Sequence, residues 1–329
     1  MNERELQDAV SRLPKSIEPP RDLWPDIQAR LGGSGSSWKR RWYWIPLAAA
    51  AVFFAVIIGR SIRATAWDVT ALAGRPLLGT TPLTASGRLR VGDWLQTDDS
   101  SRALVAIGRI GQVEVQPDTR LQLVVAHADE HRLALARGRI DATVDAMPRL
   151  FFVDTPAGTA IDLGCAYSLE TDSLGNGRLH VTRGEVEFAT GRHSSRVPLG
   201  AIMLTRRTIG PGIPFVEDAP GPLVRALIAF DFDKGGARAA RNVLTLARAQ
   251  DALSLWHLLQ RVDAPLRASV YDRLAALVPP PPGVTRRAAI ALEAGALEEY
   301  WTKIHRIHFR RMVLKGVRNI DPRTGTTLR

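Results

Sequence analysis

Cys165 is the one cysteine in this 329-residue chain and the first candidate for chemistry. It lies in the run from Ala160 to Tyr167, whose composition predicts a strand, where a buried thiol behaves as a small apolar residue. A nucleophilic thiolate needs a basic environment that lowers its pKa, and this run contains no basic residue. A lone cysteine also excludes an intrachain disulfide framework. We therefore expect Cys165 to be buried and inert.

Two histidine pairs could contribute to a metal site: His127 with His131, and His305 with His308. Each spacing can place two ligands on one helix face, but a zinc site usually needs three or four ligands. The pairs therefore predict surface histidines. The sequence contains no phosphate-binding GxxxxGK[ST] loop, no GxSxG nucleophile elbow and no HExxH zinc motif. We expect no enzymatic activity, no metal and no cofactor.

The first 37 residues form a short head that precedes a membrane-like segment. Pro25 suits a first helical turn, and Leu23, Ile27 and Leu31 recur at i, i+4 spacing on one apolar side. Isolated helices of this length are marginal in water, so the head is either a disordered tether or a helix that orders on a partner. A Gly/Ser-rich linker follows at residues 32–37.

The run from Trp42 to Gly59 carries no charge and follows three basic residues at 39–41. About 18 helical residues span about 27 Å, close to the hydrocarbon thickness of a bilayer, so we expect a single-pass transmembrane helix at 42–59. A buried core helix and a cleaved signal peptide, with an A-x-A-like site at residues 64–66, are the alternatives. The anchor residues expected to meet lipid are Trp42, Trp44, Phe53, Phe54, Ile57 and Ile58.

The basic triplet beside this segment favours a cytoplasmic N-terminus and a periplasmic body, although Arg60 and Arg63 weaken the bias. The expected location is therefore the inner membrane. The net charge of +11 is carried almost entirely by arginine, which is typical of genome composition, so we expect no direct nucleic-acid partner.

From residue 66 to 217 the pattern changes to short alternating runs separated by glycine, proline and acidic turns, which predicts an all-β domain. One stretch recurs: Leu133 to Val144 resembles Leu179 to Thr190, each with Arg-Gly between two apolar runs. Such an internal repeat is consistent with a corner of a β-sandwich or with a solenoid-like coil. Both arrangements stay open.

Residues 222–301 have helical spacing and predict a small α-helical bundle, interrupted by prolines at 279–282. The remainder, 302–329, is a basic tail. From Trp301 onward, lysine and arginine residues alternate with Trp301, Phe309 and Met312. We expect a helix whose apolar side packs on the bundle. The alternative is that the tail lies on an anionic membrane surface.

An ordered series of short motifs runs through the β region: Gly87 to Thr97, Gly111 to Thr119, Leu135 to Ile140, Phe152 to Gly158, Asp162 to Tyr167, and Val181 to Val186. In order and spacing the series resembles the FecR family of membrane-anchored regulators, over roughly residues 85–200. The Pro-Pro-Arg-Asp-Leu-Trp-Pro run at 19–25 is similar to the end of anti-sigma regions.

The resemblance implies a cytoplasmic head that holds an extracytoplasmic-function sigma factor, one crossing, and a periplasmic β domain that senses an unknown envelope protein or ligand. The head residues expected to contact the sigma factor are Leu23, Trp24, Ile27 and Leu31. The alternative function is an envelope scaffold or binding module without sigma-factor control. The short head favours the scaffold, and the 19–25 run favours the regulator.

Overall fold

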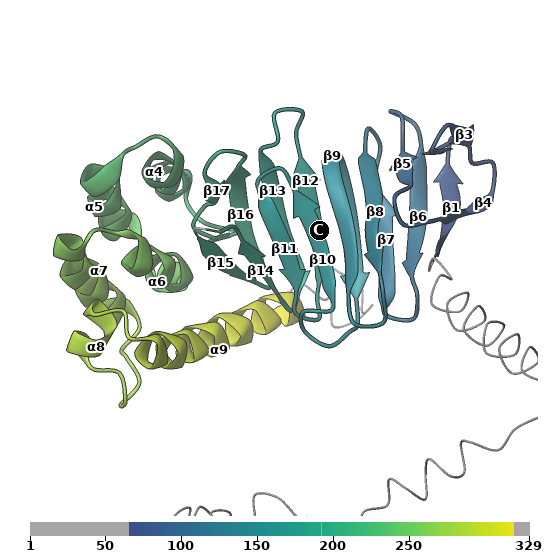
Figure 1. Cartoon of the computed structure of the whole chain (residues 1–329). Helices are drawn as coiled ribbons and strands as arrows, with labels where there is room; N and C mark the ends of the chain where they lie inside the picture. The colour runs from purple at the N-terminus through teal and green to yellow at the C-terminus, as the bar shows by residue number, and fades with distance from the viewer. Residues whose placement is uncertain (1–65, 192, 319–329) are drawn as a thin grey trace, which may run out of the picture. The chain divides into compact units, whose positions relative to one another are not determined.

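Strands fill the first part of the described chain and helices the second (Figure 1). The structure, a computed structural model, describes residues 66–191 and 193–318, which belong to one compact unit, Ala64–Arg329. The head contacts expected at Leu23, Trp24, Ile27 and Leu31 lie outside the described residues.

The strands form two sheets, antiparallel except for one pairing, that share one strand, β9 (His131–Val144). The first sheet has the order β4-β1-β6-β7-β9-β12-β13-β16, with β17 and β18 beside β16. The other strands of this sheet are β1 (Trp67–Ala73), β4 (Ser86–Leu89), β6 (Arg102–Ile107), β7 (Gly111–Val115), β12 (Ala166–Thr171), β13 (Gly177–Arg183), β16 (Ala201–Arg206), β17 (Gly210–Pro211) and β18 (Phe215–Val216).

The second sheet has the order β3-β2-β5-β8-β9-β10-β11-β14-β15. Its one parallel pairing among the described strands joins β9 to β10. The other strands of this sheet are β2 (Leu77–Leu78), β3 (Thr81–Pro82), β5 (Trp94–Gln96), β8 (Arg120–Ala126), β10 (Phe151–Thr155), β11 (Gly158–Asp162), β14 (Glu185–Ala189) and β15 (Ser194–Pro198).

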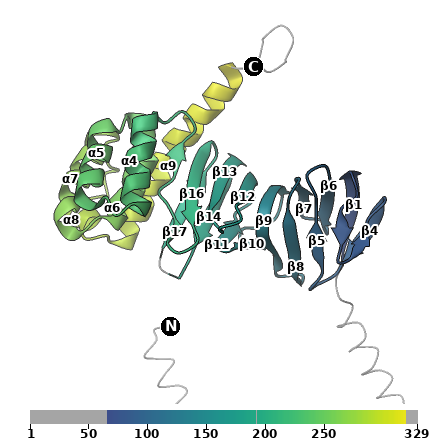
Figure 2. The same ribbon diagram turned by 90° about the horizontal axis from the view of Figure 1, so that it is seen from above.

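The two sheets enclose one hydrophobic core, so the β domain is a two-layer sandwich. The alternating sequence pattern accounts for this: β6 exposes Arg102 and buries Ala103, Val105 and Ile107. Because successive hairpins alternate between the layers, the strands also stack along the chain in the order expected of a coil (Figures 1 and 2).

Gly138 lies where β9 leaves one sheet for the other. Up to Arg137 the strand pairs with β8, and from Gly138 onward it pairs with β12 and β7. At this corner the backbone φ is +94°, and a Cβ on Gly138 would come 2.4 Å from the Cα of Thr119. Glycine is therefore required at this position.

Gly184 occupies the equivalent corner between β13 and β14. Its φ is +72°, and a Cβ would come 2.5 Å from the carbonyl oxygen of Gly164. The two Arg-Gly copies seen in the sequence are thus two passages between the sheets. They run in opposite directions, because β9 enters the first sheet and β13 leaves it.

The helical part begins directly after β18 and has its own hydrophobic core, which also takes in Ile202, Phe215 and Val216 from the last strands. Its most buried aromatic side chains are Tyr300 and Trp301 on the last helix. The elements are α4 (Gly221–Phe232), α5 (Gly236–Leu246), η2 (Ala249–Asp251), α6 (Ala252–Arg261), α7 (Ala264–Leu277), α8 (Arg286–Ile290) and α9 (Ala294–Arg318). The predicted limit between bundle and tail at residue 301 falls inside α9.

The fold class expected from the sequence needs one correction. Between residues 66 and 318, no helix combines the length and the apolar character needed to cross a membrane. The long helix α9 carries Lys303, Arg306 and Arg310, among other charges. The single-pass membrane class is therefore wrong for the described fold, which is an all-β domain followed by a helical C-terminal part. The segment predicted to cross, 42–59, with Trp42, Trp44, Phe53, Phe54, Ile57 and Ile58, lies outside the described residues.

Candidate functional site

The residues predicted to carry chemistry do not form a reactive centre. The Cys165 side chain is fully buried, and its thiol donates to Asp162 Oδ2 at 2.7 Å. Burial and the neighbouring Asp162 carboxylate raise the pKa of Cys165 far above its ordinary value. A thiolate is therefore strongly disfavoured, and Cys165 acts as a structural residue.

The histidine pairs have separate surroundings. His131 packs its ring 5.7 Å from that of Trp67, and burial lowers its pKa, whereas His127 is exposed. His305 Nε2 lies 3.4 Å from Glu185, and His308 Nε2 lies 2.6 Å from the Leu199 carbonyl oxygen. In residues 66–318 no three His, Cys, Asp or Glu side chains gather in a way that could hold a metal ion.

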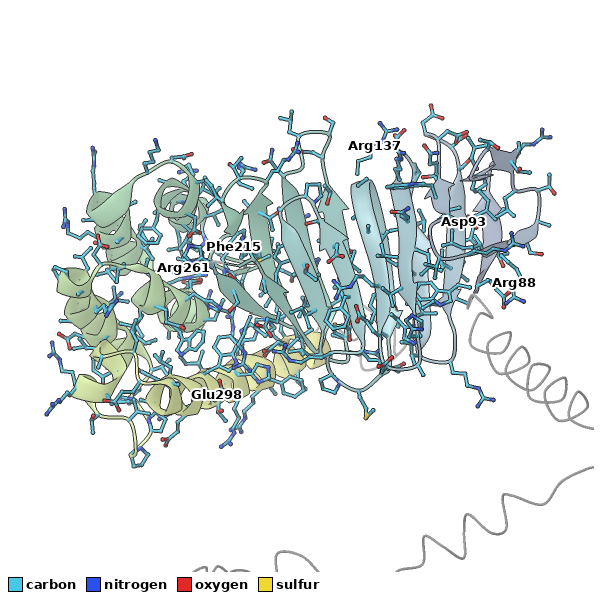
Figure 3. The ribbon with its side chains drawn as sticks, in the orientation of Figure 1. Arg88, Asp93, Arg137, Phe215, Arg261 and Glu298 are labelled. Atoms are coloured by element: carbon cyan, nitrogen blue, oxygen red, sulfur yellow. The ribbon has the colours of Figure 1, made fainter. Side chains whose placement is uncertain are left out.

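Several charged and polar side chains, including the buried Ser195, Ser254 and His257, gather instead at the junction between the β domain and the helices. Figure 3 shows Arg261 and Phe215 on the two sides of this junction, with Glu298 on α9. Three clusters form the junction, around Arg261, Arg196 and Asp218. None of them was singled out from the sequence.

Arg261 ties the end of α6 to α4 and to the last strands. Its Nη1 lies 3.0 Å from Asp231 Oδ1 and donates to the Pro211 carbonyl oxygen at 3.0 Å, and its Nη2 donates to Ser195 Oγ at 2.6 Å. Asp231 Oδ2 accepts the Ile213 backbone N–H at 2.6 Å. Only 12% of the Arg261 side chain and 5% of the Asp231 side chain are exposed.

Burial governs the ionisation of this pair. It raises the pKa of Asp231, and the nearby Arg261 guanidinium opposes the rise. Burial likewise lowers the pKa of Arg261. The two charges stabilise one another and accept or donate hydrogen bonds to the backbone, the arrangement that permits a buried ion pair.

Arg196 on β15 connects the sheet to α6 and α9. Its guanidinium bridges Glu185 at 2.7 Å and Glu298 at 2.8 Å, and lies 4.8 Å above the Trp301 ring. Its backbone N–H donates to His257 Nε2 at 3.1 Å, so His257 Nδ1–H donates to the Leu253 carbonyl oxygen. Burial lowers the pKa of His257 to about 3, which keeps this imidazole neutral.

Asp218 lies just after the last strand, β18, and holds the C-terminal end of α9. Its carboxylate lies 2.7 Å from Arg311, 3.8 Å from Lys315 and 3.9 Å from Arg248. The cations of α9 and Arg248 help to lower the pKa of Asp218, against the opposing effect of its partial burial. Together with the His308 contact, these pairs hold α9 against the turn at residues 199–200.

The junction therefore fixes the helices on the β domain. A broader hollow of about 430 Å³ lies between α4 and α5 and is lined by Pro222, Arg225, Ala226, Ala229, Asn242, Thr245 and Leu246. Its lining includes no carboxylate, histidine or thiol.

Comparisons with known proteins give little further information. No family model matches the chain, and no curated protein matches it. Two crystal structures of a candidate anti-sigma factor from Parabacteroides distasonis are similar to part of it, each with 17% identity over 41% of this chain and with TM-scores of 0.33 and 0.34. The matched part spans 64% and 63% of those two chains. These TM-scores are too low to establish a shared fold.

Proposed function

We propose that this protein is a non-enzymatic regulator of an extracytoplasmic-function sigma factor, with a FecR-like β domain that receives the signal. The observation that carries the proposal is the position of the motif series within the fold. Gly138 and Gly184, which anchor two of the motifs, are the corners at which the chain passes between the sheets. The resemblance therefore concerns residues that build the domain.

A second motif supports the proposal of a FecR-like β domain. The run Asp162 to Tyr167 packs directly against the Gly184 corner, where the Gly164 carbonyl oxygen leaves no room for a side chain. The two motifs Asp162 to Tyr167 and Val181 to Val186 thus meet across the β12–β13 hairpin.

In this proposal the head contacts the sigma factor through Leu23, Trp24, Ile27 and Leu31. These residues would form one apolar stripe that orders on the partner and covers the surface that binds core RNA polymerase. Release would follow proteolysis or a conformational change in the body. The proposed location, with the head in the cytoplasm and the β domain in the periplasm, stays a prediction.

The binding step can be tested by affinity capture. Purified full-length chain is immobilised and offered, one at a time, the extracytoplasmic-function sigma factors encoded by the genome it comes from. We expect capture by the unmodified chain and its loss when Trp24→Ala and Ile27→Asp are combined. The matched control is Met147→Ala, which changes an apolar side chain that is 77% exposed on the β domain and should leave capture intact.

Failure of the unmodified chain to retain any of these sigma factors would contradict the proposal. If it instead retained an envelope protein through the β domain, the alternative of an envelope scaffold or binding module would be favoured.

A further inference from the structure

The C-terminal half of α9 exposes apolar side chains that the sequence predicts to be packed. The exposed fractions are 46% for Ile307, 50% for Phe309, 45% for Val313 and 52% for Leu314. Figure 2 shows these last turns of α9 extending past the other helices. The apolar residues on this face therefore have no partner among the described residues that buries them.

The orientation of this face is fixed by the opposite side of the helix. Ile304 and His308 are buried, the His308 ring meets the Leu199 carbonyl oxygen, and Arg311 pairs with Asp218. A Cβ on Gly200 would collide with the Met312 side chain, so the helix lies close against this turn. Rotation that would bury the exposed residues would break all of these contacts.

Basic residues lie between the exposed apolar ones. At 100° per residue, Ile307 and Leu314 follow one edge of the face, Phe309 and Val313 follow the other, and Arg306 and Arg310 lie between them. No ion pair joins Arg306 or Arg310 to any residue in the described part of the chain. The sequence also contains no acidic residue between positions 300 and 320.

The mixture of arginine and apolar side chains on this face indicates which kind of partner can bind it. A second copy of the same face would place like charges opposite one another, which is unfavourable. An anionic bilayer surface satisfies both features, because it attracts the arginines and accepts apolar side chains at the level of the headgroups. The long arginine side chains can lie along the apolar surface while their guanidinium groups reach lipid phosphates.

We propose that the exposed face of α9, formed by Arg306, Ile307, Phe309, Arg310, Val313 and Leu314, binds the surface of an anionic lipid membrane. The helix lies flat at the interface and does not cross it. This proposal is independent of the sigma-factor proposal, because it rests only on α9.

A fluorescent dye attached to the exposed face of α9 reports membrane contact of this face alone. Contact between the membrane and another part of the chain does not change its signal. In a Cys165→Ser background, which has no other cysteine, Leu314→Cys carries an environment-sensitive nitrobenzoxadiazole label on the full-length chain. The control label is at Leu174→Cys, a residue 71% exposed in the turn between β12 and β13. Vesicles of phosphatidylcholine with and without phosphatidylglycerol are the probes.

We expect the fluorescence at position 314 to rise and shift to shorter wavelength with the anionic vesicles only, and position 174 to show no change. Replacing both arginines, Arg306→Ser with Arg310→Ser, should weaken the response about 30-fold, because each basic residue at the surface contributes a factor of about five. The conservative pair Arg306→Lys with Arg310→Lys should retain it, and circular dichroism checks the fold of each variant.

The proposal is overturned if position 314 does not respond, if neutral vesicles produce the same response, or if position 174 responds equally. An unchanged affinity in the correctly folded double serine variant also overturns it. A response to soluble poly-glutamate but not to vesicles overturns it in favour of an acidic protein partner.

Discussion

Asp231 and Arg261 show how single residues hold the helices on the β domain. Both charges are removed from water at the junction, where each depends on the other and on backbone groups of residues 211–213. Removal of one partner from a buried pair leaves an uncompensated charge, which costs more than the pair contributes when intact.

Asp231→Asn should therefore lower the free energy of unfolding by about 3 to 5 kcal/mol. The comparison is Asp272→Asn, which breaks the ion pair with Arg286 at a site where 55% of each side chain is exposed. This second change should cost far less, because water and salt screen an exposed ion pair and it contributes little to stability. Urea unfolding of the two variants measures the difference, and equal costs would contradict a buried role for Asp231.

His257 predicts a specific pH dependence of stability. Its pKa is lowered to about 3 in the folded protein, while the unfolded chain should titrate near 6.5. Between pH 3 and pH 6.5 the imidazole of the unfolded chain is protonated and that of the folded protein is neutral. The free energy of unfolding therefore decreases as the pH falls below 6.5. His257 alone should lower the free energy of unfolding by about 1.4 kcal/mol for each pH unit in this range.

Thermal unfolding followed from pH 7 to pH 5 should show a smaller loss of stability in His257→Gln than in the unmodified chain. His127→Gln, which changes an exposed histidine, should retain the full loss. If His257→Gln and the unmodified chain lose stability in parallel, the buried neutral imidazole is the wrong explanation.

Cys165 should tolerate a change that keeps its hydrogen bond. Cys165→Ser retains a donor to Asp162, whereas Cys165→Ala removes it and should lower the free energy of unfolding by about 1 to 3 kcal/mol. Both variants should still capture the sigma factor, because the thiol of Cys165 is buried and stays protonated, so it takes no part in binding. Loss of capture by the correctly folded serine variant would assign Cys165 a functional role.

At this scale the sequence predicted the burial of Cys165 but missed the junction. Asp231 and His257 could have been noticed as polar residues inside apolar helical runs. Their partners lie far away along the chain: Arg196 is 61 residues from His257, and Arg261 is 30 residues from Asp231. Pairing over such distances depends on the fold and leaves no local signal.

Among the secondary-structure elements, the two sheet corners are the part of the fold that the sequence indicated best. The repeated Arg-Gly pattern marked both Gly138 and Gly184. The alternating runs also predicted which side of each strand is buried, as in β6. They could not assign strands to one sheet or the other, because both sheets of a sandwich have the same period of two.

Gly138→Ala should strongly destabilise the β domain. The new Cβ would meet the Thr119 backbone at 2.4 Å in addition to the unfavourable φ of +94°. Gly79→Ala is the matched control, because its φ is +62° but nothing lies within 4 Å of a Cβ there. Backbone strain alone should cost about 1 to 2 kcal/mol, so Gly138→Ala should exceed Gly79→Ala clearly in chemical denaturation. Equal costs would show that the close approach at the corner is not required.

Helix α9 is the element whose role the sequence described least well. Its periodicity predicted an apolar side packed on the bundle, and Ile304 does pack there, but four other apolar residues of its last turns remain exposed. A helical pattern reveals amphipathic character without revealing how far the neighbouring elements extend. Here the bundle covers the first half of α9, and the β domain covers only one side of the second.

At the scale of the whole molecule, the described chain is one body made of two cores joined by charged contacts. The order of a β domain followed by helices could be predicted from composition and periodicity. The membrane class could not be carried over to the described fold, because the apolar segment that suggested it lies outside the described residues. The function rests on the motif series and on a head that is known only as sequence.

The most direct test of the sigma-factor proposal is transcription in a purified system. Core RNA polymerase, the extracytoplasmic-function sigma factor that the chain captures, and a promoter that this sigma factor recognises are combined with increasing amounts of full-length chain. We expect transcripts to decline as the amount of chain approaches that of the sigma factor, and we expect the combined Trp24→Ala and Ile27→Asp variant to relieve the decline. Unchanged transcription in the presence of excess full-length chain would contradict it.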